Sequence, residues 1–354
     1  RNNGTSSLGD WVVCKEKLPE GIKGLTASAR EKGLKFGIWI EPEMVNPKSE
    51  LAEKHPDWIV RPPKREAPTT RNQWLLDLTN PKVQDFVFGV FDNTMKLSDK
   101  IDYIKWDANR NANNVGSAYL PADEQSRFWI DYAQGFYKVM ERIRAKYPDV
   151  LIQACASGGG RVEYGALKYF DEFWTSDNTE ALSRARIQYG TSLFYPAVVM
   201  GSHVSATPNH QTGNITPIKF RFDMACAGRL GMELQPKQMT DAEKAFARRA
   251  IASVFYGDML CALRNQVAPY ENEKGAADKM VDLWVQRLGR VLLAGKGFTS
   301  REMKHTFPLI AKDFKSIPVT RVPKVKVGVV GEIYVKYSPL GNNDLQKFLE
   351  SQDC

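Results

Sequence analysis

The chain has 354 residues, of which 43% are hydrophobic and 25% charged, which is typical of a globular protein with one barrel-sized domain and a smaller part. It has no apolar run of about eighteen residues, so no transmembrane helix is predicted. The 49 basic and 41 acidic residues give a net charge of +8 but are mixed along the chain, which argues against nucleic-acid binding. Five cysteines without paired spacing argue against a disulfide framework and a zinc site.

The first hundred residues predict alternating helices and strands. Apolar positions at helical spacing, followed by Gly33, predict a helix over residues 18–32. Residues 35–40 are predicted as a strand, which Pro42 stops among aromatic and acidic side chains. A proline-rich loop over residues 55–70 leads to a strand-like stretch over 71–78, which begins at Arg71. Pro81 then begins a helix that runs to residue 97.

The next predicted strand, over residues 101–107, ends in a polar cluster. Its apolar, β-prone start leads directly to Lys105, Asp107 and Asn109. Polar residues at the end of a buried strand are typical of side chains that point into a shared pocket. The alternative is a buried strand with a solvated acidic end. We take Asp107 as the chemical centre of the cluster.

The alternation continues to residue 253. Helices are predicted over residues 123–146, 181–189, 217–227 and 241–253, and strands over 150–154, 172–175, 193–200 and 228–234. Residues 201–204 follow the strand predicted over 193–200, and a loop covers residues 208–214. The loop over residues 155–161 contains three glycines, which permit a ligand to approach the backbone closely. The alternative is a plain flexible turn, and because no lysine follows the glycines, it is no phosphate loop.

Strands and helices that alternate from residue 35 to residue 253 require a parallel sheet. Polar residues gathered at the strand ends favour an α/β fold of the (β/α)₈ TIM-barrel type, incomplete or nearly complete, over a doubly wound sheet. No G-x-G-x-x-G motif follows an early strand, which supports the same choice.

Two strand-end carboxylates, Asp107 and Asp177, are the candidate catalytic pair. Each lies next to an indole, Trp106 or Trp174, that could present an apolar face to a sugar ring. Two carboxylates across one sugar ring are the minimum machinery for glycoside hydrolysis, in which one stays ionised and the other holds a proton. The alternative is that both are helix caps or members of loop salt bridges.

Eight short motifs follow one another along residues 1–250: GDW at 9–11, FGIWIEPEMV at 36–45, HPDW at 55–58, RNQ at 71–73, KWDANR at 105–110, CASGGGR at 155–161, WTSDN at 174–178 and PNHQTG at 208–213. In residues and order they resemble the microbial α-galactosidases of glycoside hydrolase family 36. The resemblance implies a retaining α-galactosidase on a (β/α)₈ barrel, with Asp107 as the nucleophile and Asp177 as the general acid/base. It also implies galactose contacts at Trp39, Arg71, Lys105, Asn109, Cys155, Gly158 and Trp174.

The same resemblance implies a galactose-containing oligosaccharide as substrate, no metal or organic cofactor, and no nucleic-acid or membrane partner. Family members often form homo-oligomers, and they are bacterial cytoplasmic or periplasmic proteins, which leaves the compartment of this chain unknown. Cys155 and the Gly158 backbone would face the C2 substituent of the sugar. An α-N-acetylgalactosaminidase or a galactosyl transferase of the same family therefore stays an alternative.

The chain also departs from the family pattern. The family places two barrel strands before the region of Gly9, the second ending in adjacent aspartates that hold the sugar, so we expect a barrel that lacks these strands. The resemblance covers residues 1–253, the predicted catalytic domain. Residues 254–323 are predicted as a helical segment. Residues 324–354 are predicted as an incomplete α/β segment that more nearly resembles activases of 2-hydroxyacyl-CoA dehydratases, without a cysteine cluster for iron–sulfur. An alternative function class is therefore that the chain is an inactive fragment, or a chimera with a tail that resembles an activase of acyl-CoA dehydratases.

Overall fold

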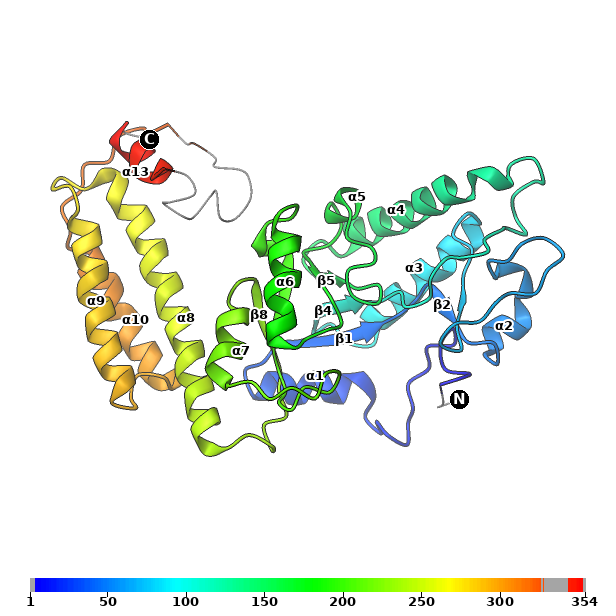
Figure 1. Cartoon of the computed structure of the whole chain (residues 1–354), viewed down its shortest axis with the longest axis horizontal. Helices are drawn as coiled ribbons and strands as arrows, with labels where there is room; N and C mark the ends of the chain where they lie inside the picture. Colours follow the sequence, from blue (N-terminus) through cyan, green and yellow to red (C-terminus); the bar gives the residue numbers. More distant parts are fainter. Residues whose placement is uncertain (1–3, 326, 328–342, 353–354) are drawn as a thin grey trace. The chain divides into compact units, whose positions relative to one another are not determined.

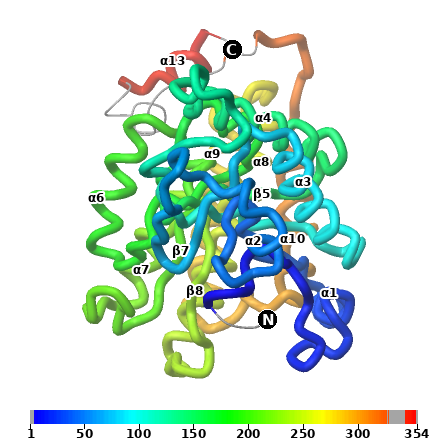
Figure 2. Tube along the Cα trace, turned by 90° about the vertical axis from the view of Figure 1, so that its right-hand side faces the viewer, coloured from blue at the N-terminus to red at the C-terminus, as the bar shows by residue number. Residues whose placement is uncertain are grey.

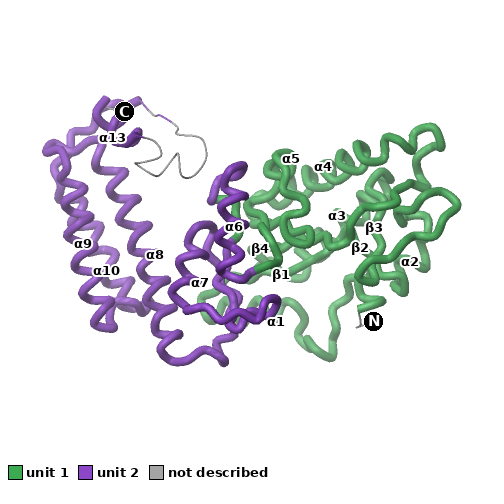
Figure 3. The backbone as a smooth tube through the Cα atoms, in the orientation of Figure 1, with its two compact units in different colours: residues 1–178, 198–201 green, residues 179–197, 202–354 purple. Residues whose placement is uncertain are grey.

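The computed structural model describes residues 4–325, 327 and 343–352 (Figure 1). The chain separates into two compact units (Figure 3): Arg1–Asn178 with Val198–Gly201, and Thr179–Ala197 with Ser202–Cys354. This division differs from the predicted domains 1–253, 254–323 and 324–354, which stay a prediction. Most of the strand predicted near the start of the last segment lies outside the described residues.

The chain forms a six-stranded sheet in the order β1-β4-β5-β6-β7-β8. Each neighbouring pair from β1 to β7 is parallel. Helices connect the strands along the chain, so the sheet is a partial (β/α)₈ barrel, and the predicted fold class is confirmed. The strands are β1 (Phe36–Ile40), β4 (Ile101–Trp106), β5 (Leu151–Ala154), β6 (Glu172–Trp174), β7 (Met200–Ser205) and β8 (Arg229–Glu233).

The helices of the first unit are α1 (Gly21–Glu31), α2 (Glu50–Lys54), α3 (Pro81–Lys96), α4 (Phe128–Lys146) and α5 (Tyr164–Leu167). Helices α3 and α4 pack side by side (Figures 1 and 2). Helix α3 begins where predicted because Pro81 fits the first turn and the Asn80 side chain accepts a hydrogen bond from the Lys82 N–H. Its buried face carries Val87 and Phe91, which cover the outside of the sheet.

A small two-stranded sheet lies outside the main sheet, and its first strand follows the end of β1. Strands β2 (Met44–Val45) and β3 (Trp74–Leu75) pair antiparallel. The strand predicted over residues 71–78 is therefore wrong in extent. Arg71 and Asn72 have φ angles of 56° and 57°, so the chain reverses there in a tight turn before it can pair with β2.

The second unit contains α6 (Ala181–Ser192), α7 (Ile218–Ala225), α8 (Asp241–Val267), α9 (Ala276–Leu293), α10 (Ser300–Lys315) and α13 (Leu345–Ser351). Helix α8 extends well beyond the predicted end at Ser253, because nothing after its Thr240–Glu243 capping box stops it before Pro269. It joins two apolar clusters: Ala247 packs with α7, whereas Tyr256 packs with α9 and α10. None of the described helices has the length and apolar composition to cross a membrane.

Strand β7 corrects another prediction. The strand predicted over residues 193–200 is wrong in position: residues 197–199 make a 3₁₀ turn, and β7 begins only at Met200, the last residue of the predicted strand. Pro196 has no N–H to give to a central ladder, so regular pairing begins only after it. The apolar residues Leu193 and Phe194, which suggested the strand, are exposed.

Candidate active site

Asp107 follows the last residue of β4 and is buried, with 7% of its surface exposed. Its backbone N–H continues the pairing with β1 by donating to the Ile40 carbonyl at 2.9 Å. The Trp39 indole N–H donates to Asp107 Oδ2 at 2.9 Å, and the Ala108 N–H donates to Oδ1 at 3.0 Å. The carboxylate is thus held by a strand end, a neighbouring indole and its own turn.

Lys105 and Trp174 lie on the inner face of the same sheet. The Lys105 Nζ atom is 4.8 Å from the centroid of the Trp174 ring, which is a cation–π contact. Trp174 is 2% exposed, whereas Trp39 at the end of β1 is 41% exposed. Gly201 on β7 makes room for Trp174, since a Cβ there would lie 3.2 Å from the indole. Trp174 therefore supports Lys105, and Trp39 offers an open aromatic face.

Trp106 faces away from Lys105 and Asp107, which corrects the expectation that an indole on each side would present a face to a sugar. Its ring packs against Phe91 of α3 and Phe136 of α4, with ring centroids 6.3 and 6.1 Å apart. Side chains alternate along a strand, so Lys105 and Asp107 point to one face of β4 and Trp106 points to the other. Trp106 is therefore a core residue between the sheet and helices α3 and α4.

The glycine-rich loop after β5 connects the ends of β4 and β6. The Cys155 N–H donates to the Trp106 carbonyl at 2.8 Å. Burial raises the pKa of the Cys155 thiol to about 12, and the adjacent Asp107 carboxylate adds to the rise. Gly158 has a φ of 87°, and a Cβ there would lie 3.0 Å from the Asp177 nitrogen. The loop therefore contacts both candidate carboxylate positions.

Asp177 lies on the loop after β6, three residues beyond Trp174, and its side chain is exposed. Strands β4 and β6 are both neighbours of β5, so Asp107 and Asp177 follow parallel strands on either side of it. The carboxyl ends of parallel strands meet at one edge of the sheet, which is where a barrel collects its functional residues.

Arg71 and Asn109 lie on two further loops of the first unit. Arg71 is exposed on the turn before β3, where the Thr70 carbonyl accepts a hydrogen bond from the Gln73 N–H at 2.9 Å. A left-handed φ at an arginine is strained, and such strain is concentrated at functional sites. Asn109 is buried, and its Oδ1 accepts a hydrogen bond from the Ser157 N–H at 3.1 Å. Asn109 is thereby joined to the glycine-rich loop.

Two buried carboxylates, Glu41 and Glu43, belong to one of the sequence motifs but were not predicted to have a role. Glu43 is fully buried and accepts hydrogen bonds from the Trp106 indole and the Tyr132 hydroxyl, as well as two from Arg161. Glu41 is 1% exposed, and burial raises its pKa to about 7. The signal in the sequence was a pair of acidic residues around Pro42, directly after an apolar strand.

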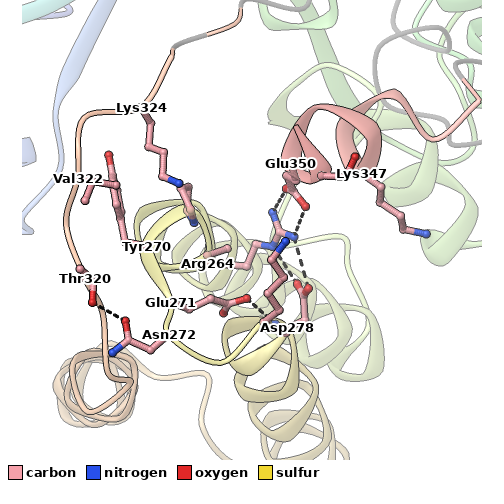
Figure 4. A pocket seen from close by; sticks show the side chains of 15 residues that line it. Arg264, Tyr270, Glu271, Asn272, Asp278, Thr320, Val322, Lys324, Lys347 and Glu350 are labelled. Atoms are coloured by element: carbon pink, nitrogen blue, oxygen red, sulfur yellow. Dashed lines mark hydrogen bonds and ion pairs between the residues drawn. The ribbon is translucent and has the colours of Figure 1, made fainter. Parts of the chain in front are cut away.

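A cavity of about 420 Å³ lies in the second unit between the end of α8, the start of α9 and α13 (Figure 4). Its charges are largely paired: Arg264 forms ion pairs with Glu350 at 2.5 Å and with Asp278 at 2.8 Å. Glu271 caps α9 through the Ala277 N–H at 2.7 Å. None of the predicted site residues lines this cavity. Within the described part of the chain, no group of three His, Cys, Asp or Glu could hold a metal ion.

Known families and proteins match the larger part of the chain. The sequence profile of the Melibiase family matches residues 1–259. The chain is 44% identical over 259 residues to α-galactosidase AgaA of Geobacillus stearothermophilus, covering 73% of the chain and 35% of that enzyme. It is 44% identical over 245 residues to α-galactosidase Mel36A of Lactobacillus acidophilus, covering 69% of the chain and 33% of that enzyme.

Solved structures of α-galactosidases also superpose on the chain. The chain superposes on the crystal structure of AgaA with a TM-score of 0.69, covering 72% of the chain and 35% of AgaA. A crystal structure of an AgaA variant in complex with raffinose superposes with a TM-score of 0.70 at 43% identity, covering 73% of the chain and 36% of that protein. The chain thus spans about a third of the length of the relatives it matches.

Proposed function

The chain belongs to the Melibiase family, which matches residues 1–259, and on this premise we propose that the protein hydrolyses terminal α-D-galactosides of oligosaccharides with retention of configuration. The observation that carries the proposal is the position of two carboxylates, Asp107 and Asp177, after β4 and β6, on either side of the glycine-rich loop. A pair of carboxylates at one edge of a barrel sheet is the minimum machinery for this reaction.

Asp107 is the proposed nucleophile. A nucleophilic carboxylate must be held still and must approach the anomeric carbon closely. The hydrogen bond from Trp39 and the rigid end of β4 fix its position. The inward-pointing Lys105 precedes it by two residues on the strand and supplies positive charge on the same face. In the proposed reaction, Asp107 attacks the anomeric carbon and forms a galactosyl ester as the leaving group departs.

Asp177 is the proposed general acid/base. It is exposed, which suits a group that protonates the leaving oxygen and then activates a water molecule. Neighbouring strands lie about 4.8 Å apart, so the backbones of β4 and β6 are separated by about 10 Å. Side chains that extend toward each other from these two strands can reach the separation of about 5–5.5 Å that retaining glycosidases use.

Five of the seven sugar contacts implied by the family resemblance fit this arrangement, whereas Trp174 and Cys155 are only 2% and 3% exposed. Trp39 offers an exposed aromatic face, and Lys105 and Arg71 supply donors for hydroxyl groups. Asn109 lies between Asp107 and the glycine-rich loop. Gly158 lets the backbone of that loop approach the Asp177 segment closely. Because an AgaA structure holds raffinose, we propose oligosaccharides of the raffinose type as substrates.

The test is hydrolysis of an aryl α-galactoside by the protein and three variants. We expect Asp107→Asn to lower kcat by about 10³-fold or more and Asp177→Asn to slow substrates with poor leaving groups most, because those need the acid. Asp102→Asn is the matched control: Asp102 lies at the opposite end of β4, paired with Arg30 at 2.7 Å, and its removal should leave the rate nearly unchanged.

Two further measurements check the assignment. NMR of the first-formed product should show α-galactose, and azide added to an Asp107→Gly variant should restore turnover and give a β-galactosyl azide, because glycine leaves room for azide where the carboxylate was. An unchanged rate in Asp107→Asn would remove Asp107 as the nucleophile. A clear preference for the aryl α-N-acetylgalactosaminide over the galactoside would replace the proposed substrate by that of the alternative enzyme.

A further inference from the structure

We propose that Glu41 is a positioning residue of the sugar site, whose buried carboxyl group fixes the Asn109 backbone and the Arg71 turn beside Asp107. The inference rests on the proposed function, because Arg71 and Asn109 are proposed to bind the sugar. Glu41 follows the last residue of β1 and is 1% exposed, so it cannot itself be reached by a substrate. Its effect must pass through the groups that it contacts.

The first contact is with the backbone that carries Asn109. The Asn109 N–H donates to Glu41 Oε1 at 2.6 Å, a short hydrogen bond within the buried interior. Asn109 comes two residues after Asp107, so this bond fixes the turn that follows the nucleophile. The Asn109 side chain in turn accepts a hydrogen bond from the Ser157 N–H, so its orientation depends on where this backbone lies.

The second contact is with the strained turn that presents Arg71. The Gln73 side-chain Nε2 donates to Glu41 Oε2 at 3.0 Å. Gln73 closes the turn in which Arg71 and Asn72 both have positive φ angles, and the Asn46 side chain holds the Asn72 carbonyl at 2.7 Å. Two consecutive non-glycine residues in this region persist only where surrounding contacts hold them. Glu41 supplies one of these contacts.

The charge environment of Glu41 differs from that of its neighbour Glu43. Arg161 neutralises Glu43 through two hydrogen bonds, whereas the charged groups that act on the pKa of Glu41 are the Asp107 carboxylate, which raises it, and the Arg71 guanidinium, which lowers it to a smaller extent. Burial raises the pKa of Glu41 to about 7, the hydrogen bond from Asn109 opposes the rise, and Asp107 adds to it. At slightly acidic pH, Glu41 is therefore neutral.

Gln73 can pair with a neutral Glu41. In the described residues, Gln73 Oε1 is buried without a hydrogen-bond partner. The two ends of a side-chain amide are assigned from their hydrogen bonds, and rotating this amide by half a turn would place Oε1 opposite Glu41 Oε2. A protonated Glu41 would then donate to Gln73 while still accepting from Asn109. This arrangement pairs Gln73 Oε1 with a donor, while Gln73 Nε2 moves to the position that the oxygen held before.

The test uses two variants of the protein, with an aryl α-galactoside as the substrate. Glu41→Ala removes both contacts, so we expect KM to rise about 10-fold or more with a smaller change in kcat, which is the signature of lost sugar binding. Glu41→Gln keeps an acceptor for Asn109 and a donor for Gln73, and should restore KM to within about threefold at pH 6. The ratio of kcat/KM between the wild type and Glu41→Gln should be constant below pH 6 and change through pH 7.

Asp77→Asn is the control for a purely structural effect. Asp77 is also fully buried in the first unit and its pKa is also raised by burial, but its hydrogen bonds go to Thr79 and Ser117. The Asp77→Asn variant should leave KM unchanged, and the ratio of its kcat/KM to that of the wild type should not change through pH 7. A wild-type KM in Glu41→Ala, or a ratio that does not vary with pH, would overturn the role of Glu41 while the proposed function stands.

Amide exchange separates this inference from the proposed function. The Asn109 N–H should exchange with solvent at least about 10-fold faster in Glu41→Ala than in the wild type or Glu41→Gln, because its acceptor is lost. Unchanged exchange would overturn the inference even if the protein hydrolyses α-galactosides. If the protein does not hydrolyse the glycoside, the proposed function fails, and faster exchange in Glu41→Ala still supports the anchoring of Asn109 by Glu41.

Discussion

Arg161 donates two parallel hydrogen bonds to the fully buried carboxylate of Glu43, from Nη1 to Oε1 at 2.6 Å and from Nη2 to Oε2 at 2.8 Å. Arg161 ends the glycine-rich loop, and Glu43 lies just after β1. The ion pair therefore attaches the end of this loop to the segment that follows β1. The Glu43 carboxylate outweighs the effect of burial on Arg161 and raises the pKa of its guanidinium. The Arg161 guanidinium therefore stays charged.

Replacing Arg161 by methionine leaves the charge of Glu43 buried without its counterion. We expect Arg161→Met to lower the free energy of unfolding by about 3–5 kcal/mol, measured by urea denaturation, because an unpaired buried charge is costly. Arg142→Met is the control, since Arg142 pairs with Asp85 on the surface at 2.8 Å, and it should cost less than about 1 kcal/mol. Equal losses in the two variants would show that burial does not strengthen the Arg161–Glu43 pair.

Gly158 is predicted to keep the Asp177 segment in place. An alanine there would be strained at a φ of 87° and would place its Cβ 2.9 Å from the Ser176 Cα. We expect Gly158→Ala to lower kcat for an aryl α-galactoside by about 10–100-fold, because a small displacement of a catalytic group is costly.

Gly275→Ala separates the contact from the backbone strain. Gly275 has a φ of 84°, and no heavy atom lies within 4 Å of the position that an alanine Cβ would take, so this variant reproduces the strain without the collision. It should cost about 1 kcal/mol of stability and leave kcat unchanged. A wild-type kcat in Gly158→Ala would show that the loop does not set the position of Asp177.

Cys155 is predicted to resist alkylation. Its thiol is 3% exposed, and burial together with Asp107 raises its pKa to about 12, so almost no reactive thiolate forms at pH 8. Iodoacetamide labelling followed by mass spectrometry should modify the exposed Cys261 first and Cys155 only after unfolding in urea. Labelling of Cys155 as fast as that of Cys261 in the native protein would contradict this burial.

The sequence predicted the parts of the fold and site that depend on short-range patterns. Apolar strands that end in Lys105–Asp107 and Trp174–Asp177 were recognisable because strand-end polarity is local. The orientation of Trp106 was missed, although the alternation along β4 that places Lys105 and Asp107 on one face requires it to face the helices.

Other features depend on contacts between distant residues and could not be read from patterns. Glu41 and Glu43 acquire their roles from Asn109, Gln73 and Arg161, which lie 32 to 118 positions away. The end of α8 was placed too early because the resemblance faded near Ser253, whereas no local signal stops the helix there. For Glu41 and Glu43 the missing information was which distant residues they contact, and for α8 it was how far the helix continues.

The raised pKa of Glu41 makes stability depend on pH. Its pKa rises from 4.5 to about 7 in the folded chain, so between these values the folded state holds a proton that the unfolded state has released. The free energy of unfolding therefore falls as the pH rises through this window, by about 3 kcal/mol. Glu41→Gln removes the titration, so its unfolding free energy should lack this fall.

Asp92→Asn gives a control of opposite sign. Hydrogen bonds from Lys146, Lys96 and Tyr147 lower the pKa of Asp92, so its contribution to stability is present above pH 4 and is lost as the pH falls below it. The free energy of unfolding should be measured by urea titration for the wild type and both variants at pH 4.5, 6 and 7.5. Over this range, the difference between the wild type and Glu41→Gln should change with pH, whereas the difference between the wild type and Asp92→Asn should stay constant. A wild-type curve parallel to that of Glu41→Gln from pH 4.5 to 7.5 would mean that Glu41 is ionised throughout, and that its buried charge is balanced by Arg71.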